Sequence, residues 1–266
     1  RDDVESRGLG DVYKRQASRL VAYGMGDVTL YVGENLSYEN EKIFHASAAE
    51  LTEYRGDALS VVTACNEKAV PLPAVHGICD EEFLRGKAPM TKEEVRTVSL
   101  SKLRLQEDSV CYDVGAGTGS VSVEMALRAW KGQVYAIEKK EDALALLKEN
   151  RRKFATDNLE IVPGTAPEAM VELPVPTHAF IGGSSGNMNE IIRLLLDKNP
   201  GVRIVINCIT LETVTEAMNA IRDFSLTDVD IVQLSAARSK SIGRYHMMMG
   251  ENPIYIISCS GRGEEI

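Results

Sequence analysis

The sequence lacks the features of a membrane-embedded or secreted protein. No apolar run in its 266 residues approaches the roughly 18 that cross a bilayer. There is also no basic-then-apolar leader, so we expect a cytoplasmic protein without membrane contact. The 44% hydrophobic content is enough for an ordinary packed core in one large or two small domains.

Cysteine and histidine are few and scattered. The five cysteines stand singly, mostly in apolar segments, which argues against a disulfide framework and predicts reduced core residues. The four histidines show no Cys/His spacing of the zinc type. We therefore expect no metal ion held by the protein.

Positive charge is in deficit. Thirty Lys and Arg stand against 39 Asp and Glu, which gives a net charge of -9. Phosphate contacts need concentrated Lys and Arg, so no nucleic-acid partner is expected. A local basic group nevertheless occurs near the C-terminus, at Arg238, Lys240 and Arg244, and is either a solvated loop or a patch for an anionic substrate.

The most informative motif is Asp113-Val-Gly-Ala-Gly-Thr-Gly119. A strand-like alternation precedes it, and residues 121–127 follow with the spacing of a packed helix. Glycines at such a turn let the backbone approach a ligand, and we expect free N–H groups at the helix start to attract electron-rich groups. The alternative is a tight turn that binds nothing.

Glu138 supports a ligand. It ends the next predicted strand, 133–137, where an acid can accept hydrogen bonds from both hydroxyls of a ribose. A dinucleotide fingerprint requires its last two glycines three residues apart, whereas Gly117 and Gly119 are two apart. With Asp113 before the first glycine, the spacing resembles the S-adenosylmethionine (SAM) motif of class I methyltransferases.

Strands and helices alternate from residue 90 onward. A helix is predicted over 92–102 with Thr91 as its N-cap. The remaining predictions are strands at 110–114, 133–137, 159–162, 177–181 and 202–208, and helices at 142–154, up to 198, and 212–224. Two final strands, 228–236 and 254–259, are expected to pair antiparallel. The predicted fold class is α/β, a class I SAM-dependent methyltransferase (Rossmann-like) with a mostly parallel sheet and one antiparallel strand.

The N-terminal part has a different pattern. Residues 17–70 predict a small α/β segment, with strands at 28–32 and 58–64 and a helix at 46–54. Residues 1–16 are expected to be non-native or disordered, and 71–89 to be a linker before a methyltransferase domain at 90–266.

Five separated motifs resemble one known family. They lie at 77–96, 113–119, 164–168, 181–187 and 236–238, in the order found in the decarboxylating precorrin-6B C15-methyltransferases of cobalamin biosynthesis. The resemblance covers about 77–266. It implies SAM-dependent methylation of C15 and loss of carbon dioxide from the ring C acetate, on a substrate with or without cobalt.

The preceding segment has a resemblance of its own. Residues 24–36 and 46–51 are similar to the C-terminal part of the precorrin C5-methyltransferases, which are often fused to the C15 enzyme. This resemblance implies a truncated tetrapyrrole methylase remnant without C5 activity.

The resemblance also implies a set of site residues. The positions that match the SAM contacts of the family are Thr91, Gly115, Ala116, Gly117, Thr118, Gly119, Glu138 and Ala166. At Thr165 many methyltransferases carry an acid that binds the adenine amino group, so a side-chain contact there is in doubt. For Thr91 a cap role and a ligand contact are both open.

Substrate contacts are expected at two places. Ser184 and Asn187 follow a predicted strand end where acceptors are commonly oriented, or form a simple helix entry. Because the substrate carries many carboxylates, Arg238, Lys240 and Arg244 are expected to bind them. Catalytic residues are not identified.

Three further points remain open from the sequence. The family resemblance suggests a homo-oligomer, plausibly a tetramer. One alternative is a class I methyltransferase that acts on tRNA or protein. The other is a truncated fragment that binds SAM without turnover.

Overall fold

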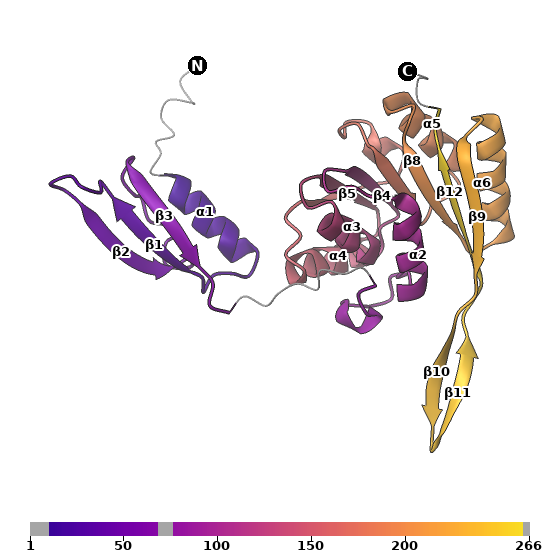
Figure 1. Cartoon of the computed structure of the whole chain (residues 1–266), viewed down its shortest axis with the longest axis horizontal. Coiled ribbons are helices and arrows are strands. Elements are labelled where there is room, and N and C mark those ends of the chain that lie inside the picture. Colours follow the sequence, from indigo (N-terminus) through magenta and orange to yellow (C-terminus); the bar gives the residue numbers. More distant parts are fainter. Residues whose placement is uncertain (1–10, 69–76, 263–266) are drawn as a thin grey trace. The chain divides into compact units, whose positions relative to one another are not determined.

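The chain divides into two compact units, with the division between residues 72 and 73. The structure, a computed structural model, describes residues 11–68 and 77–262, with the backbone alone for 11–13. The expectations for residues 1–10 and for the first part of the linker, 71–76, fall outside these residues. Each unit is described by itself (Figure 1).

The first unit packs one helix on a small sheet. Helix α1 (Asp11–Ala22) is followed by β1 (Thr29–Glu34), β2 (Lys42–Ser47) and β3 (Ser60–Cys65), which form an antiparallel sheet in the order β2-β1-β3. Leu30 and Val32 alternate onto the buried face, where they join Ala17 of the helix. Residues 11–16, expected in a disordered lead-in, lie in α1.

The helix predicted at 46–54 is wrong. Residues up to Ser47 belong to β2, where Ala46 is opposite Leu30 and Phe44 is opposite Val32, and turns follow the strand. The alanine-rich composition favours a helix locally, but pairing with β1 and burial of the sheet face outweigh that preference.

The second unit is built on a seven-stranded sheet. Its strands are β4 (Val110–Val114), β5 (Gln133–Glu138), β6 (Leu159–Pro163), β7 (His178–Ile181), β8 (Arg203–Cys208), β9 (Thr227–Leu234) and β12 (Ile254–Ser260). The order is β6-β5-β4-β7-β8-β12-β9, parallel from β6 to β8. Strand β12 is antiparallel to both neighbours, which confirms the predicted reversed strand. Strand β4 pairs with β5 on one side and with β7 on the other, so the strand order reverses between β4 and β7.

Helices cover both faces of this sheet. Helices α2 (Glu93–Leu103), α3 (Ser120–Arg128) and α4 (Glu141–Lys153) form one core with the sheet, and α5 (Met188–Lys198) and α6 (Leu211–Asp223) form the other. Every residue of β8 is buried, as expected for a central strand covered twice. The class I methyltransferase fold predicted from the sequence is confirmed.

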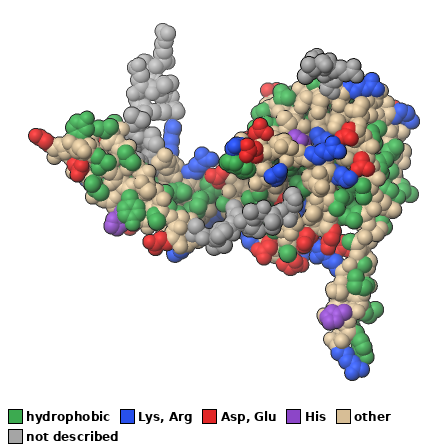
Figure 2. All heavy atoms as spheres, in the orientation of Figure 1, with side chains coloured by type: hydrophobic (Ala, Val, Ile, Leu, Met, Phe, Trp, Pro, Cys, Tyr) green, Lys and Arg blue, Asp and Glu red, His purple; other side chains and the backbone are tan. Residues whose placement is uncertain are grey.

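A β-hairpin that the sequence did not predict separates β9 from β12. Strands β10 (Ala237–Ile242) and β11 (Tyr245–Gly250) pair with each other alone and extend away from the sheet (Figure 1). All residues of β11 are exposed, and Figure 2 shows hydrophobic side chains on the surface of the hairpin. The basic group expected in a loop therefore lies on a two-stranded ribbon.

The segment before α2 is part of the second unit's core. A short 3-10 helix, η1 (Asp80–Glu82), lies between the buried side chains of Ile78 and Phe83, so core packing begins inside the predicted linker. Thr91 is not the N-cap of α2: that position is Lys92, whose side chain makes no capping bond. The carboxylate of Asp80 accepts the Glu93 N–H instead, at 3.0 Å.

The described part of the chain has neither a membrane-spanning helix nor a cluster of metal ligands. No helix in it is long and apolar enough to span a bilayer. No group of three or more His, Cys, Asp or Glu in it is placed to hold a metal ion.

Candidate functional site

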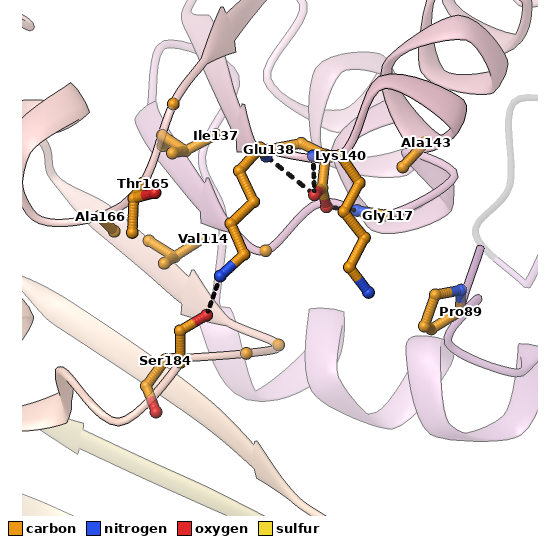
Figure 3. A pocket seen from close by; sticks show the side chains of 16 residues that line it. Pro89, Val114, Gly117, Ile137, Glu138, Lys140, Ala143, Thr165, Ala166 and Ser184 are labelled. Carbon is orange, nitrogen blue, oxygen red and sulfur yellow. Dashed lines mark hydrogen bonds between the residues drawn. The ribbon is translucent and has the colours of Figure 1, made fainter.

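A pocket opens at the carboxyl ends of β4, β5 and β7, where the strand order reverses. This is the place where open α/β sheets bind ligands. Its walls are the loops after these strands, the β6–η2 loop, which precedes the short 3-10 helix η2 (Glu168–Met170), and Pro89 from the segment before α2 (Figure 3). Val114, Ile137, Ala143 and Ala166 give it an apolar lining. The pocket can therefore hold a flat apolar group with polar groups at its rim.

The glycine loop forms the floor of the pocket at Gly115 and Gly117. Gly117 has φ +57°, and a Cβ there would lie 2.5 Å from the Pro89 carbonyl oxygen. Gly119 has φ +79°, and its Cβ would lie 2.0 Å from Leu147 of α4. Glycine is thus required at Gly117 for the pocket and at Gly119 for packing of the helices.

Four backbone N–H groups of the loop have hydrogen-bond partners within the chain. Those of Gly115 and Ala116 donate to the Ile137 carbonyl at 3.0 and 3.1 Å, and that of Gly119 donates to the Ala116 carbonyl. The Gly117 N–H donates to Glu138. These bonds fold the loop onto the end of β5, while the free N–H groups expected at the start of α3 stay a prediction.

Glu138 is the best-anchored acid of the pocket. One carboxylate oxygen accepts the Gly117 N–H at 2.9 Å, and the other accepts those of Lys139 and Lys140 at 2.8 and 2.9 Å (Figure 3). A carboxylate has about four lone-pair sites, so at least one remains for a ligand hydroxyl. The geometry suits a ribose diol.

Asp113 is buried beneath the loop rather than in the pocket. The Ser122 hydroxyl donates to its Oδ2, which joins the end of β4 to α3. Burial raises the pKa of Asp113 to about 7, and Glu138 adds to the rise. Asp113 therefore shapes the loop and does not contact a ligand directly.

Ala166 and Asn187, which belong to two separate motifs, are in contact. The Asn187 side-chain amide donates to the Ala166 carbonyl at 3.0 Å and so fixes the β6–η2 loop against the start of α5. Ala166 and Ser184 line the pocket. Asn187 does not line the pocket itself, but its hydrogen bond holds Ala166, which does.

The other predicted cofactor positions lie outside the pocket lining. Thr118 is fully buried and its hydroxyl has no hydrogen-bond partner, while Gly119 is covered by Leu147. Ala116 is half-buried behind the loop. The carbonyl of Thr91 accepts from Arg96 at 2.6 Å, so its backbone is fixed beside Pro89. These four positions support the pocket and are not part of its surface.

Two lysines line the pocket that the sequence analysis overlooked. Lys139 and Lys140 follow Glu138, and the Lys139 ammonium donates to the Ser185 hydroxyl at 3.1 Å from the opposite wall. No ion pair of either lysine is found within residues 11–68 and 77–262. A signal was present in the sequence, because both directly follow the acid at a strand end.

The predicted basic group is not at the pocket. Lys240 and Arg244 are exposed on the hairpin, and Arg244 donates to the Tyr245 hydroxyl. Arg238, at the base of β10, pairs with the carboxylate of Glu94 at 2.7 Å. That pair lowers the pKa of Glu94 and raises the pKa of Arg238.

A buried ionic cluster beside the pocket also escaped prediction. Arg96 of α2 is fully buried and its Nε donates to Glu124 of α3 at 2.5 Å. Asp80 lies 3.4 Å from the same guanidinium, which stacks on the ring of Phe83. Since the partners are far apart in sequence, no local pattern reveals the cluster.

Comparison with known proteins gives consistent matches over the second unit. The family described as "Precorrin methyltransferase domain" matches residues 82–260. A probable cobalt-precorrin-6B C(15)-methyltransferase (decarboxylating) of Pyrobaculum calidifontis is 44% identical over 188 residues, which is 70% of this chain and 96% of that protein. The cobalt-precorrin-6B C(15)-methyltransferase (decarboxylating) of Salmonella typhimurium is 42% identical, over 68% of this chain and 94% of that protein.

A solved structure agrees. The precorrin-6y C5,15-methyltransferase of Geobacter metallireducens superposes with a TM-score of 0.67 at 39% identity, over 71% of this chain and 99% of that chain. The matched share is close to that of the second unit, which contains the pocket.

Proposed function

The chain belongs to the precorrin methyltransferase family, and from this premise we propose that it methylates C15 of a precorrin-6B-type tetrapyrrole and decarboxylates its ring C acetate. The observation that supports this most is the family match over the whole sheet that forms the pocket. S-adenosyl-L-methionine is the methyl donor of this family.

The pocket residues fit that cofactor. The remaining lone pairs of Glu138 could accept hydrogen bonds from the hydroxyls of a ribose, and Ile137, Ala143 and Ala166 would give an apolar slot for adenine. Gly115 and Gly117 let the methionine end approach the backbone closely. When bound, SAM supplies an electrophilic methyl group, and the protein contributes chiefly by holding donor and acceptor in line.

We infer that the tetrapyrrole lies over the loop after β7. Ser184 lines the pocket there, and Asn187 fixes its wall. Loss of carbon dioxide breaks a carbon–carbon bond of the acetate and leaves the electron pair on the macrocycle, where hydrogen bonds and cations stabilise it. Lys240 and Arg244 are proposed to bind substrate carboxylates. Arg238 could bind one only if its ion pair with Glu94 were broken.

We also propose that the enzyme is a homo-oligomer, plausibly a tetramer. The hairpin exposes Ile242, Tyr245 and three consecutive methionines, and such apolar surface on a protruding ribbon supports association with other copies. Replacing Met248 with glutamate is expected to lower the molecular mass in analytical ultracentrifugation. An unchanged mass would contradict this role of the hairpin.

The remaining assignments rest on sequence patterns. Residues 17–70 are proposed to be a C-terminal remnant of a precorrin C5-methyltransferase. The net charge of -9 supports a role without nucleic acid, and a cytoplasmic location is proposed as well.

The decisive test of function is turnover. Purified protein is incubated with labelled SAM and either cobalt-precorrin-6B or metal-free precorrin-6B, and product mass is measured. We expect a gain of one methyl group together with loss of carbon dioxide, and the faster reaction identifies the physiological substrate. Methylation of tRNA or protein alone, or SAM binding without turnover, would overturn the proposal.

A further inference from the structure

A chain of charged groups connects the hairpin with the cofactor pocket. Its central member is Asp80, which is 2% exposed. Asp80 Oδ1 accepts the Glu93 N–H and lies 3.4 Å from Arg96 Nη1. Its Oδ2 faces two outer cations, Lys92 at 3.7 Å and Arg238 at 3.5 Å.

On the inner side of Asp80, the charged groups hold residues 77–92, which we call the strap. Arg96 donates to the carbonyls of Ile78 and Thr91 near the two ends of the strap. Glu124, paired with Arg96 at 2.5 Å, also accepts the N–H groups of Gly77 and Ile78. Both ends of the strap are thus attached to α2 and α3 by buried ionic groups, which are strongly directional in a low-dielectric interior.

The strap is a wall of the cofactor pocket. Pro89 lines the pocket, and its carbonyl oxygen would lie only 2.5 Å from a Cβ atom added to Gly117. A small displacement of the strap therefore changes the space above the glycine loop directly.

On the outer side of Asp80, Arg238 links the charged groups to the hairpin. Four carboxylates surround its guanidinium: Glu94 at 2.7 Å, Asp80 at 3.5 Å, Glu251 at 3.6 Å and Glu93 at 3.9 Å. Glu251 directly follows β11, and the others belong to α2 and the strap. An arginine already shared by four acids is poorly placed to bind a substrate carboxylate.

We propose that Arg238 is a positioning residue that couples the placement of the hairpin, through Asp80 and Arg96, to the strap and so to SAM affinity. The proposal rests on the cofactor assigned above and not on the identity of the methyl acceptor. It departs from the sequence expectation that Arg238 binds the tetrapyrrole.

The test measures the dissociation constant of SAM by calorimetry on the full chain. Arg238→Gln removes the charge, and Arg238→Lys keeps it. Arg222→Gln makes the same neutral change at an exposed ion pair, with Asp223 on α6. We expect Arg238→Gln to weaken SAM binding about two- to tenfold, Arg238→Lys to restore most of it, and Arg222→Gln to leave it unchanged.

Two outcomes would overturn the proposal. Unchanged SAM affinity in Arg238→Gln with a lowered melting temperature means a purely local structural role. Unchanged SAM affinity with a raised KM for the tetrapyrrole means a substrate contact. If Arg238→Gln does not fold, Glu94→Gln removes the nearest partner at an exposed position, and unchanged SAM affinity in that variant refutes the coupling. A failure of the proposed reaction is distinguishable, because it abolishes turnover and not the difference in SAM affinity.

Discussion

Among single residues of the pocket, Glu138 gives the most direct test of the proposed ribose contact. Three backbone N–H groups hold its carboxylate, and Glu138→Gln would place an amide NH2 toward one of these donors. We expect SAM affinity to fall about ten- to hundredfold, the loss of a hydrogen bond to a charged acceptor. Calorimetry measures it, with Glu160→Gln on β6 as a control of equal charge change. Equal affinities in the two variants would refute a role in ribose binding.

Gly117 gives a second prediction on the pocket floor. An alanine there would combine φ +57° with a Cβ 2.5 Å from the Pro89 carbonyl oxygen. We expect Gly117→Ala to destabilise the fold by about 1–3 kcal/mol and to weaken SAM binding. Urea denaturation checks the first effect. Gly26→Ala, whose Cβ would have ordinary contacts of 3.5 and 3.6 Å, is the control and should change neither property.

Asp113 makes stability depend on pH in a direction that is unusual for an aspartate. Burial raises its pKa from 3.8 to about 7 in the folded chain. Between these values the folded state holds a proton that the unfolded state has released, so its contribution to the free energy of unfolding falls as pH rises. Asp113→Asn should remove this contribution.

The measurement is urea unfolding of both proteins at several pH values between about 4 and 7. The difference in unfolding free energy between variant and wild type should shift in favour of the variant as pH rises. Parallel pH profiles would show that Asp113 has an ordinary pKa in the folded state.

On the scale of elements, the pair of Arg96 and Glu124 joins α2 to α3. Removing one partner leaves the other charge buried, so Arg96→Met is expected to lower the free energy of unfolding by about 3–5 kcal/mol. The double variant Arg96→Met/Glu124→Met should lose less than the sum of the single variants. Additive losses in denaturant titrations would mean that the two side chains act independently.

The elements predicted correctly from the sequence are those whose hydrophobic pattern follows directly from their burial. Strands β4, β5 and β8 are buried along almost all of their length because helices cover both faces of the sheet, and glycine spacing located the pocket. The hairpin was not predictable, since nearly all of its residues are exposed and it buries no apolar face against the rest of the chain. A helix was wrongly predicted at 46–54, where β2 ends at Ser47 and turns follow, because pairing with β1 decides where the strand ends.

Site residues follow the same division. Glu138 and Gly117 were predictable from a local motif that the structure places together in the pocket. The ion pairs of Arg96 and Arg238 join residues 13 to 158 positions apart, from Arg238–Glu251 to Arg238–Asp80, and a single sequence does not contain that information. Lys139 was overlooked although it adjoins Glu138, because its partner Ser185 lies on another loop.

For the molecule as a whole, the division into two units predicts that the second unit binds SAM without the first. The curated relatives match the second unit over 94–96% of their own length, so a chain of residues 73–266 should contain a complete cofactor site. We expect this shortened protein to bind SAM with the affinity of the full chain, as measured by calorimetry. A loss of more than tenfold would show that the first unit contributes to the pocket.

The position of the hairpin has an evolutionary consequence. Leu234 at the end of β9 is paired directly with Ile254 at the start of β12, so the intervening residues leave and re-enter the sheet at one point. Insertions or deletions there do not alter the order or register of the seven strands. The ribbon can thus be lengthened or shortened without disturbing the sheet that carries the pocket.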